Sequence, residues 1–230
     1  MASNAEKDQE KELAARASLR FVGEGDVVGL GSGSTAAFAV SLLGERVQQG
    51  LKITGVPTSV HTGQLAASLG IPLATLEQFQ DLAVTIDGAD EVDPSLNLIK
   101  GGGGALLREK VVASASRQLI IVADAGKQVA RLGRFPLPVE VIPFARALVA
   151  ARIARLGATV TLRQASGGGP FVTDEGHHIL DCQFGQIDDP PAVARALSDM
   201  PGVVEHGLFI GMASLALFGT RDRVIELWRR

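Results

Sequence analysis

Three short segments between residues 87 and 110 carry side chains that could perform acid–base chemistry. The first contains Asp87 and Asp90, the second is Lys100 followed by four glycines, and the third contains Glu109. Carboxylates can accept hydrogen bonds from sugar hydroxyls or transfer protons, and glycine lets a ligand approach the backbone closely. Because so many charges would be costly in a packed core, this window predicts a site for a small polar ligand.

Glu109 belongs to a predicted helix and lies on its apolar side. Its neighbours three and four positions away are Ala105, Leu106, Val112 and Ala113. Desolvation raises the pKa of a carboxyl group held partly inside a protein, toward the value that a general base needs near neutral pH. Lys100 could offset part of that shift, and an ordinary salt bridge to a nearby cation is the alternative role for this glutamate.

Residues 31–36, GSGSTA, match the pattern G-x-G-x-x-A of dinucleotide-binding turns. The following strand ends in TGVP at residues 54–57, without the acidic residue that would hold a ribose, and a Walker lysine is missing. Backbone N–H groups and hydroxyls at a positive helix terminus remain, and they suit a single phosphate. An ordinary tight turn with a helix cap is the competing interpretation.

The acidic stretch has its own alternatives. A calcium loop is disfavoured because the alternating carboxylates and terminal glutamate of that motif are missing. A solvated turn describes Glu91 and Asp93 well, but it describes Asp87 poorly, because Asp87 ends an apolar strand. A flexible linker is the competing interpretation of the four glycines after Lys100, but linkers are rarely so short or placed between a strand and a helix. A turn or a ligand that requires bare backbone is therefore favoured.

Composition narrows the class of protein. The 230 residues carry a net charge of -3 without a basic stripe, so no nucleic-acid partner is expected. Cys182 is the single cysteine, which excludes an intrachain disulfide and predicts a small buried hydrophobic residue. Residues 1–11 lack the apolar core of a secretory signal, and no apolar run reaches the roughly 18 residues of a membrane span. A soluble, cytoplasmic protein without a membrane partner is expected.

The chain alternates strands and helices in its first part. Strands are predicted at residues 26–30, 51–56, 82–86, 98–99 and 119–123, and helices at 36–47, 60–69 and 105–116. Ser34 or Thr35 is expected to cap the first of these helices. Apolar strands separated by helices predict an α/β fold with a parallel sheet buried on both faces, whose ligand sites lie beyond the carboxyl ends of the strands.

Prolines at positions 136, 138 and 143 predict a domain boundary. The next elements are a strand near this boundary, a helix at 146–156, strands at 159–163 and 178–183, a helix at 191–198 and a strand starting at 203. This order resembles a split βαβ unit, with a hairpin turn at 166–170. Residues 208–228 are expected to return to the first domain, which gives residues 1–135 with 208–230 and a smaller domain of 136–207.

Six blocks of sequence together resemble the type A ribose-5-phosphate isomerases. They are GLGSGSTA at 29–36, DGADE at 87–91, KGGG at 100–103, REK at 108–110, ADAGK at 123–127 and FPLPVEVIP at 135–143. The blocks occur in the order of that family, and the match extends from about residue 11 to residue 220. One departure is a fourth glycine before Ala105, where many relatives have three.

The resemblance implies a Rossmann-like parallel-sheet domain with a smaller ferredoxin-like α+β domain. It implies an aldose–ketose isomerase of the non-oxidative pentose phosphate pathway that interconverts D-ribose 5-phosphate and D-ribulose 5-phosphate through an enediolate, without metal or cofactor. The expected ligand is a small sugar phosphate, and the expected assembly is a homodimer or homotetramer.

Roles for individual residues follow from the same resemblance. Glu109 is expected to move a proton between C2 and C1, while Asp87 and Asp90 bind sugar hydroxyls. Asp87 is also expected to assist ring opening, and Lys100 to lie near the oxygens on which charge develops. The expected catalytic residues are therefore Glu109, Asp87 and Lys100. The expected substrate-binding residues are Ser32, Gly33, Ser34, Thr35, Asp87, Gly88, Ala89, Asp90, Lys100, Gly101, Gly102, Gly103, Lys127 and Lys11.

Two other functions compete with an isomerase. A non-catalytic sugar-phosphate sensor would be expected to carry a DNA-reading helix pair or a basic face, and neither is apparent in the sequence. A nucleotide-dependent transferase is disfavoured by the missing ribose-binding acid and phosphate loop.

Overall fold

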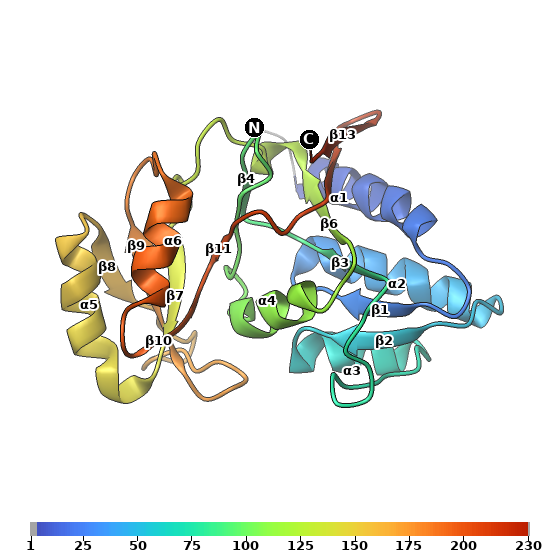
Figure 1. Ribbon diagram of the computed structural model, residues 1–230. Helices are drawn as coiled ribbons and strands as arrows, with labels where there is room; N and C mark the ends of the chain where they lie inside the picture. The colour runs from blue at the N-terminus through green and yellow to red at the C-terminus, as the bar shows by residue number, and fades with distance from the viewer. Residues whose placement is uncertain (1–3, 230) are drawn as a thin grey trace.

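The computed structural model describes residues 4–229 and contains a larger and a smaller sheet (Figure 1). The larger sheet has the strand order β13-β12-β6-β3-β1-β2. Its strands are β1 (Val27–Leu30), β2 (Thr54–Pro57), β3 (Val84–Asp87), β6 (Leu119–Asp124), β12 (Leu215–Gly219) and β13 (Val224–Trp228). Neighbouring strands are parallel except at the edge, where β13 runs antiparallel to β12. The expected parallel sheet is therefore confirmed, with one antiparallel edge strand added.

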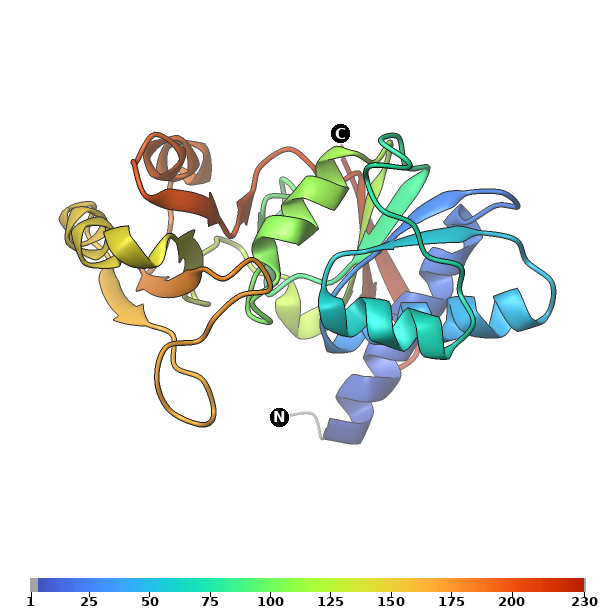
Figure 2. The ribbon, with the colours of Figure 1, turned by 90° about the horizontal axis from the view of Figure 1, so that it is seen from below.

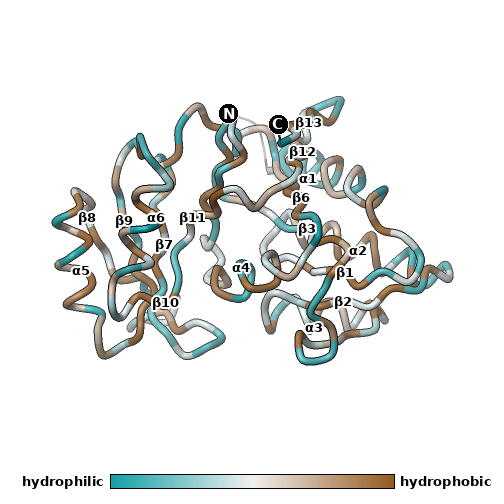
Figure 3. The backbone as a smooth tube through the Cα atoms, viewed as in Figure 1, coloured by the Kyte–Doolittle hydropathy of each residue, from teal (hydrophilic) through white to brown (hydrophobic). Residues whose placement is uncertain are grey.

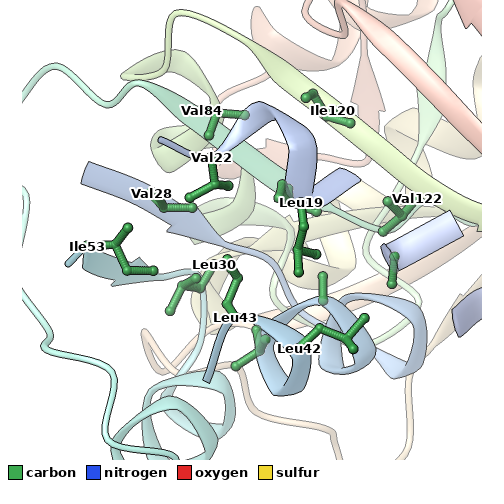
Figure 4. Close-up of a cluster of buried hydrophobic side chains, with 14 of the residues drawn as sticks. Leu19, Val22, Val28, Leu30, Leu42, Leu43, Ile53, Val84, Ile120 and Val122 are labelled. Atoms are coloured by element: carbon green, nitrogen blue, oxygen red, sulfur yellow. The ribbon is translucent and has the colours of Figure 1, made fainter. Parts of the chain in front are cut away.

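Strands β3, β6 and β12 are buried along their whole length, and β6 is apolar along most of its length in Figure 3. Ile120 and Val122 pack with α1 (Asn4–Ser18) and α2 (Ser34–Gln48) on one face (Figure 4). Ile121 and Ala123 pack on the opposite face, because successive strand residues point to opposite sides. The highly charged helix α1 was not predicted, and its buried residues Ala14 and Ala15 hold it against the sheet.

Two features near the start of the sheet differ from prediction. Helix α2 begins at Ser34 itself, and the residue before it, Gly33, has a φ of 91° and makes no side-chain cap. The expectation that Ser34 or Thr35 caps this helix is therefore wrong. Strand β2 begins at Thr54, three residues later than expected. Helix α3 (Val60–Ser68) agrees closely with prediction and is capped by the Ser59 hydroxyl.

The smaller sheet has the order β10-β7-β9-β8 and is antiparallel throughout. Its elements are β7 (Leu137–Val141), α5 (Arg146–Arg155), β8 (Thr159–Leu162), β9 (His178–Gln183), α6 (Pro190–Ser198) and β10 (Val203–His206). This is the split βαβ order that the sequence predicts, and Cys182 is fully buried in its core as expected. The turn at residues 166–170 is confirmed by a hydrogen bond from the Ala165 amide to the Gly169 carbonyl.

A third, three-stranded sheet and helix α4 lie between the two larger ones (Figures 1 and 2). Its strands are β4 (Glu91–Val92), β5 (Leu98–Ile99) and β11 (Leu208–Phe209), and α4 is Leu106–Ser114. Helix α4 packs against β3 of the larger sheet and against β7 and β10 of the smaller one. Residues 215–228 return to the larger sheet as β12 and β13, whereas residues 208–209 form β11 of the third sheet. The assignment of these residues to one domain and the domain boundaries stay predictions.

The acidic residues after β3 differ from the expected solvated turn. Glu91 is fully buried in β4, and its carboxylate accepts hydrogen bonds from the Gly133 and Phe135 amides, both at 2.7 Å. Asp93 is 9% exposed and accepts hydrogen bonds from the amides of Ser95 and Asn97. The interpretation of Glu91 and Asp93 as solvated is therefore wrong, because their carboxylates organise the backbone of neighbouring loops.

Within residues 4–229, we find no helix with the length and apolar character needed to cross a membrane.

Candidate active site

A polar cavity of about 90 Å³ lies beyond the carboxyl ends of β1, β3 and β6. This is the edge of a parallel sheet at which ligands are expected. The cavity is lined by Ser32, Gly33, Ser34, Thr35, Gly88, Ala89, Asp90, Lys100, Gly101, Gly102, Gly103, Glu109 and Lys127. The fold thus brings together around one cavity nearly all the residues that the sequence marks for chemistry.

Asp87 lies directly beneath this cavity and is completely buried. Its Oδ1 accepts hydrogen bonds from the amides of Ser32 (3.0 Å) and Gly88 (2.7 Å). A Cβ atom on Gly31 would lie 2.3 Å from the same oxygen, so the turn after β1 can approach Asp87 only because residue 31 is glycine. Burial raises the pKa of Asp87, although the charge of Lys100 and the two amides act against the rise.

Lys100 extends from the end of β5 into the centre of the site. Its ammonium lies 2.9 Å from Asp87 Oδ2 and 3.4 Å from Glu109 Oε1, and it donates to the Gly88 carbonyl at 2.5 Å. The side chain is 2% exposed. Desolvation alone would lower the pKa of Lys100, but the nearby carboxylates of Asp87 and Glu109 outweigh it and raise the pKa above its ordinary value. A cation is therefore fixed between two acidic groups.

Glu109 lies in the first turn of α4 and lines the cavity. Leu106, Val112 and Ala113 on the same helix are buried, as the apolar face predicts. Glu109 Oε2 has no hydrogen-bond partner among the described residues. Desolvation raises the pKa of Glu109 to about 8, with Lys100 opposing the rise and Asp87 and Asp90 adding to it. Such a carboxyl group can gain or lose a proton near neutral pH.

The glycine loop, residues 101–104, forms the wall between Lys100 and α4. Gly101 and Gly104 have φ values of 102° and 84°, in the left-handed region that glycine adopts most readily. The Gly102 amide donates to Asp90 Oδ2 at 2.8 Å. A Cβ on Gly102 would lie 2.6 Å from Asp90 Oδ1, so this approach also depends on glycine.

The N-terminus of α2 forms another part of the cavity wall. Ser34 and Thr35 start the helix, and no side chain caps its first amides. Lys127 follows β6 in a short 3-10 helix (Ala125–Lys127) and lines the same cavity. Free amides, a helix dipole and a cation together suit a phosphate group.

Sequence reasoning missed a group of hydroxyls behind this region. The Ser32 hydroxyl is within 2.8 Å of the hydroxyls of Thr58 and Ser59 and within 3.2 Å of that of Thr62. The Thr58–Ser59 pair, placed between a predicted strand and a predicted helix, was the available signal. Lys11 is not among the residues that line the cavity, and its ammonium contacts Asp8 at 3.0 Å on α1.

Comparison with known proteins gives consistent results. The family model described as ribose 5-phosphate isomerase A (phosphoriboisomerase A) matches residues 54–223. A relative named ribose-5-phosphate isomerase A from Bradyrhizobium diazoefficiens is 55% identical, over 95% of this chain and 96% of its own. A relative of the same name from Synechococcus sp. is 56% identical, over 97% and 98% of the two chains.

Solved structures agree in fold. The ribose 5-phosphate isomerase of Plasmodium falciparum superposes with a TM-score of 0.93 at 35% identity, covering 97% of this chain and 99% of that one. A D-ribose-5-phosphate isomerase in complex with phospho-erythronic acid superposes with a TM-score of 0.95 at 40% identity, covering 97% and 99%. This chain is therefore an isomerase that belongs to the ribose 5-phosphate isomerase A family.

Proposed function

We propose that the protein interconverts D-ribose 5-phosphate and D-ribulose 5-phosphate through an enediolate, with Glu109 as general base, in the non-oxidative pentose phosphate pathway. The observation that carries the proposal is the Glu109 carboxylate, which is buried, lines the cavity, and has no hydrogen-bond partner for Oε2 within residues 4–229. A base whose pKa is raised to about 8 can both remove a proton and return it near neutral pH.

The reaction starts from the open-chain aldose. Glu109 removes the proton on C2, and the electron pair moves through the new C1–C2 double bond onto the aldehyde oxygen O1, which gives the enediolate. O1 then gains a proton, the O2 hydroxyl loses its proton, and C1 takes the proton back from Glu109. The product is the ketose, and the base is restored to its initial state.

Charge on the enediolate oxygens needs donors that are already in place, since preorganised donors cost no reorganisation during the reaction. Lys100 supplies a buried cation held by Asp87 and Glu109. The glycine loop supplies backbone amides along the same wall. Asp87 and Asp90 are proposed to bind sugar hydroxyls, and Asp87, whose pKa burial raises, to assist ring opening as well.

The phosphate is proposed to bind where the start of α2 lines the cavity. Ser32, Gly33, Ser34 and Thr35 present the start of α2, and Lys127 adds a positive charge. Gly88, Ala89, Gly101, Gly102 and Gly103 line the same cavity and are proposed to contact the substrate. A phosphate contact for Lys11 stays a prediction, as do the homodimer or homotetramer and the cytoplasmic location.

Glu109→Gln tests the base directly. We expect kcat to fall by about 10²- to 10⁴-fold, because the amide cannot accept the C2 proton. The assay measures turnover of ribose 5-phosphate by the purified protein in the presence of a metal chelator. The oligomeric state of the same sample is measured by size-exclusion chromatography. Glu175→Gln is the matched control, because Glu175 is a half-exposed carboxylate bound to Arg108 outside the cavity. Substantial activity in Glu109→Gln would refute the base, and ligand binding without turnover by the unaltered protein would favour a sensor.

Thermal unfolding separates loss of the base from loss of the fold. The native state keeps a proton on Glu109 up to about pH 8, whereas the unfolded chain releases it near 4.5. The free energy of unfolding therefore falls as the pH rises through this window. Glu109→Gln does not share this fall, so its unfolding temperature at high pH is expected to equal or exceed that of the unaltered protein.

A further inference from the structure

Arg163, the residue that follows β8 in the smaller sheet, reaches the glycine loop of the active site. Its Nη1 donates to the carbonyl oxygens of Gly101 (2.8 Å) and Gly102 (3.2 Å). The other edge of the guanidinium binds both carboxylate oxygens of Asp181, at 3.0 and 2.5 Å. The side chain is 14% exposed. A planar fork held at one edge by a carboxylate is fixed in orientation at its other edge.

Phe171 holds the far end of the same loop. The Phe171 amide donates to the Arg163 carbonyl at 2.9 Å, so the two residues face each other across one hairpin. A Cβ on Gly104 would lie 2.5 Å from the Phe171 ring, which therefore packs directly on the bare backbone of Gly104. The Arg163 guanidinium also lies 5.9 Å from the centre of this ring. The hairpin thus contacts both the start and the end of residues 101–104.

These contacts determine where the loop amides point. In a trans peptide unit the C=O and N–H bonds point in opposite directions. The carbonyls of Gly101 and Gly102 belong to the peptide units whose amides are those of Gly102 and Gly103. Because Arg163 binds both carbonyls, both amides are turned away from the smaller sheet. The Gly102 amide indeed donates to Asp90 at 2.8 Å, and Gly103 lines the cavity.

A loop of consecutive glycines has many conformations of similar energy, and ordering it for each turnover would cost conformational entropy. Donors that are fixed in advance avoid this cost. The contacts to the Gly101 and Gly102 carbonyls come from Arg163, which follows a strand of the smaller sheet and does not itself line the cavity.

We propose that Arg163 is a positioning residue for the isomerase reaction, which fixes the amides of Gly102 and Gly103 toward Asp90 and the cavity. The inference rests on the function proposed above for this cavity. It assigns to the smaller sheet a role in the chemical step, through the glycine loop that lines the cavity. Loss of Arg163 should therefore lower kcat without lowering the affinity for phosphate.

Arg163→Met tests this role, with Arg131→Met as matched control. Arg131 also forms an arginine–aspartate pair, to Asp188 at 2.5 Å, but it lies outside the cavity. We expect Arg163→Met to lower kcat by about 10- to 100-fold, somewhat less than the loss of one direct oxyanion donor. The inhibition constant of inorganic phosphate should stay within about twofold of its value for the unaltered protein. The inhibition constant of phospho-erythronic acid should rise by about the same factor as kcat/KM falls. Arg131→Met should change none of these values.

Two further variants make the test independent of general damage. Arg163→Lys keeps the charge but cannot bind Asp181 and two carbonyls at once, so an intermediate kcat is expected. Asp181→Asn keeps Arg163 and weakens its anchor, and a smaller loss of kcat is expected. A kcat within about twofold of the unaltered protein in Arg163→Met, or an equal weakening of phosphate inhibition, would overturn the proposal. Neither outcome would affect the proposed base, which the Glu109→Gln assay tests separately.

Discussion

Two glycine-rich loops border the same cavity and are held in different ways. Residues 31–33 join β1 to α2, and β3 of the larger sheet holds them: the Gly31 amide donates to the Ile86 carbonyl, and the Ser32 amide to Asp87. Residues 100–105 join β5 to α4, and contacts from several parts of the chain hold them: the Lys100 amide donates to the Gly207 carbonyl, the Gly102 amide donates to Asp90, and Arg163 binds two glycine carbonyls.

This difference separates the loop that is suited to binding the phosphate from the loop that lies beside the proposed base. The first loop is fixed by the adjacent strand β3 of the larger sheet, and it leads into a helix terminus suited to a phosphate. The second loop lies outside that sheet, and Asp90, Gly207 and Arg163 fix it beside the proposed base. Changes at the first loop should therefore affect binding, and changes at the second should affect the chemical step.

Apart from the effects of the variants described above, the largest expected effect is the pH dependence of kcat/KM. Glu109 acts as a base only when it is ionised, and its pKa is raised to about 8. The ionised fraction falls as the pH decreases, so kcat/KM should decrease roughly 50-fold from pH 8 to pH 6. The second ionisation of a substrate phosphate, at a pKa of about 6, should appear as a separate step. A pH profile that is level between pH 6 and pH 8 would contradict the assignment.

A smaller effect is expected from Lys127→Ala, since Lys127 follows β6 and lines the cavity together with the first loop. Loss of one phosphate-binding cation should raise KM by about tenfold and leave kcat within about threefold, because the contact is the same in substrate and transition state. The pH at which kcat/KM changes should stay the same. Steady-state kinetics provide the measurement, with Lys52→Ala as surface control. Lys11→Ala in the same series shows whether Lys11 also contributes to phosphate binding. A loss confined to kcat would contradict the division between the loops.

The smallest effect is expected from Gly104→Ala at the second loop. Alanine in the left-handed region costs about 1–2 kcal/mol, and its Cβ must also displace the Phe171 ring. We expect the unfolding temperature to fall by about 2–8 °C. Gly103→Ala is the matched control, because Gly103 is not left-handed and a Cβ there would have no atom within 4 Å. Equal unfolding temperatures for the two variants would argue against a packed, strained loop at Gly104.

The sequence predicts those parts of the fold and site that depend on local pattern. Apolar strands with intervening helices place the larger sheet, and the order of elements after residue 136 predicts the smaller one. The apolar neighbours of Glu109 predict its burial. Each of these features is determined by residues a few positions apart, so periodicity and turn residues are sufficient to find them.

The features that were missed depend on distant residues. Glu91 resembles a turn residue in the sequence, because the amides of Gly133 and Phe135 that donate to its carboxylate are more than 40 residues away in the chain. Arg163 looks like an ordinary strand-end cation, because its partners in the glycine loop are about 60 residues away in the chain. The charged helix α1 is held by contacts with β6 and β12 rather than by an amphipathic pattern. Pairwise contacts of this kind leave no mark in a single sequence.

The position of β12 between β6 and β13 has a consequence for biosynthesis. β6 ends at Asp124, and its neighbour β12 is completed only at Gly219, after the whole smaller sheet has been made. Because segments emerge from the ribosome in order, the nascent chain carries Asp87, Lys100 and Glu109 long before β12 and Gly207 are available to complete their surroundings. Until residues 215–219 have been made, the edge of β6 that pairs with β12 is uncovered, and an unpaired apolar strand edge favours aggregation.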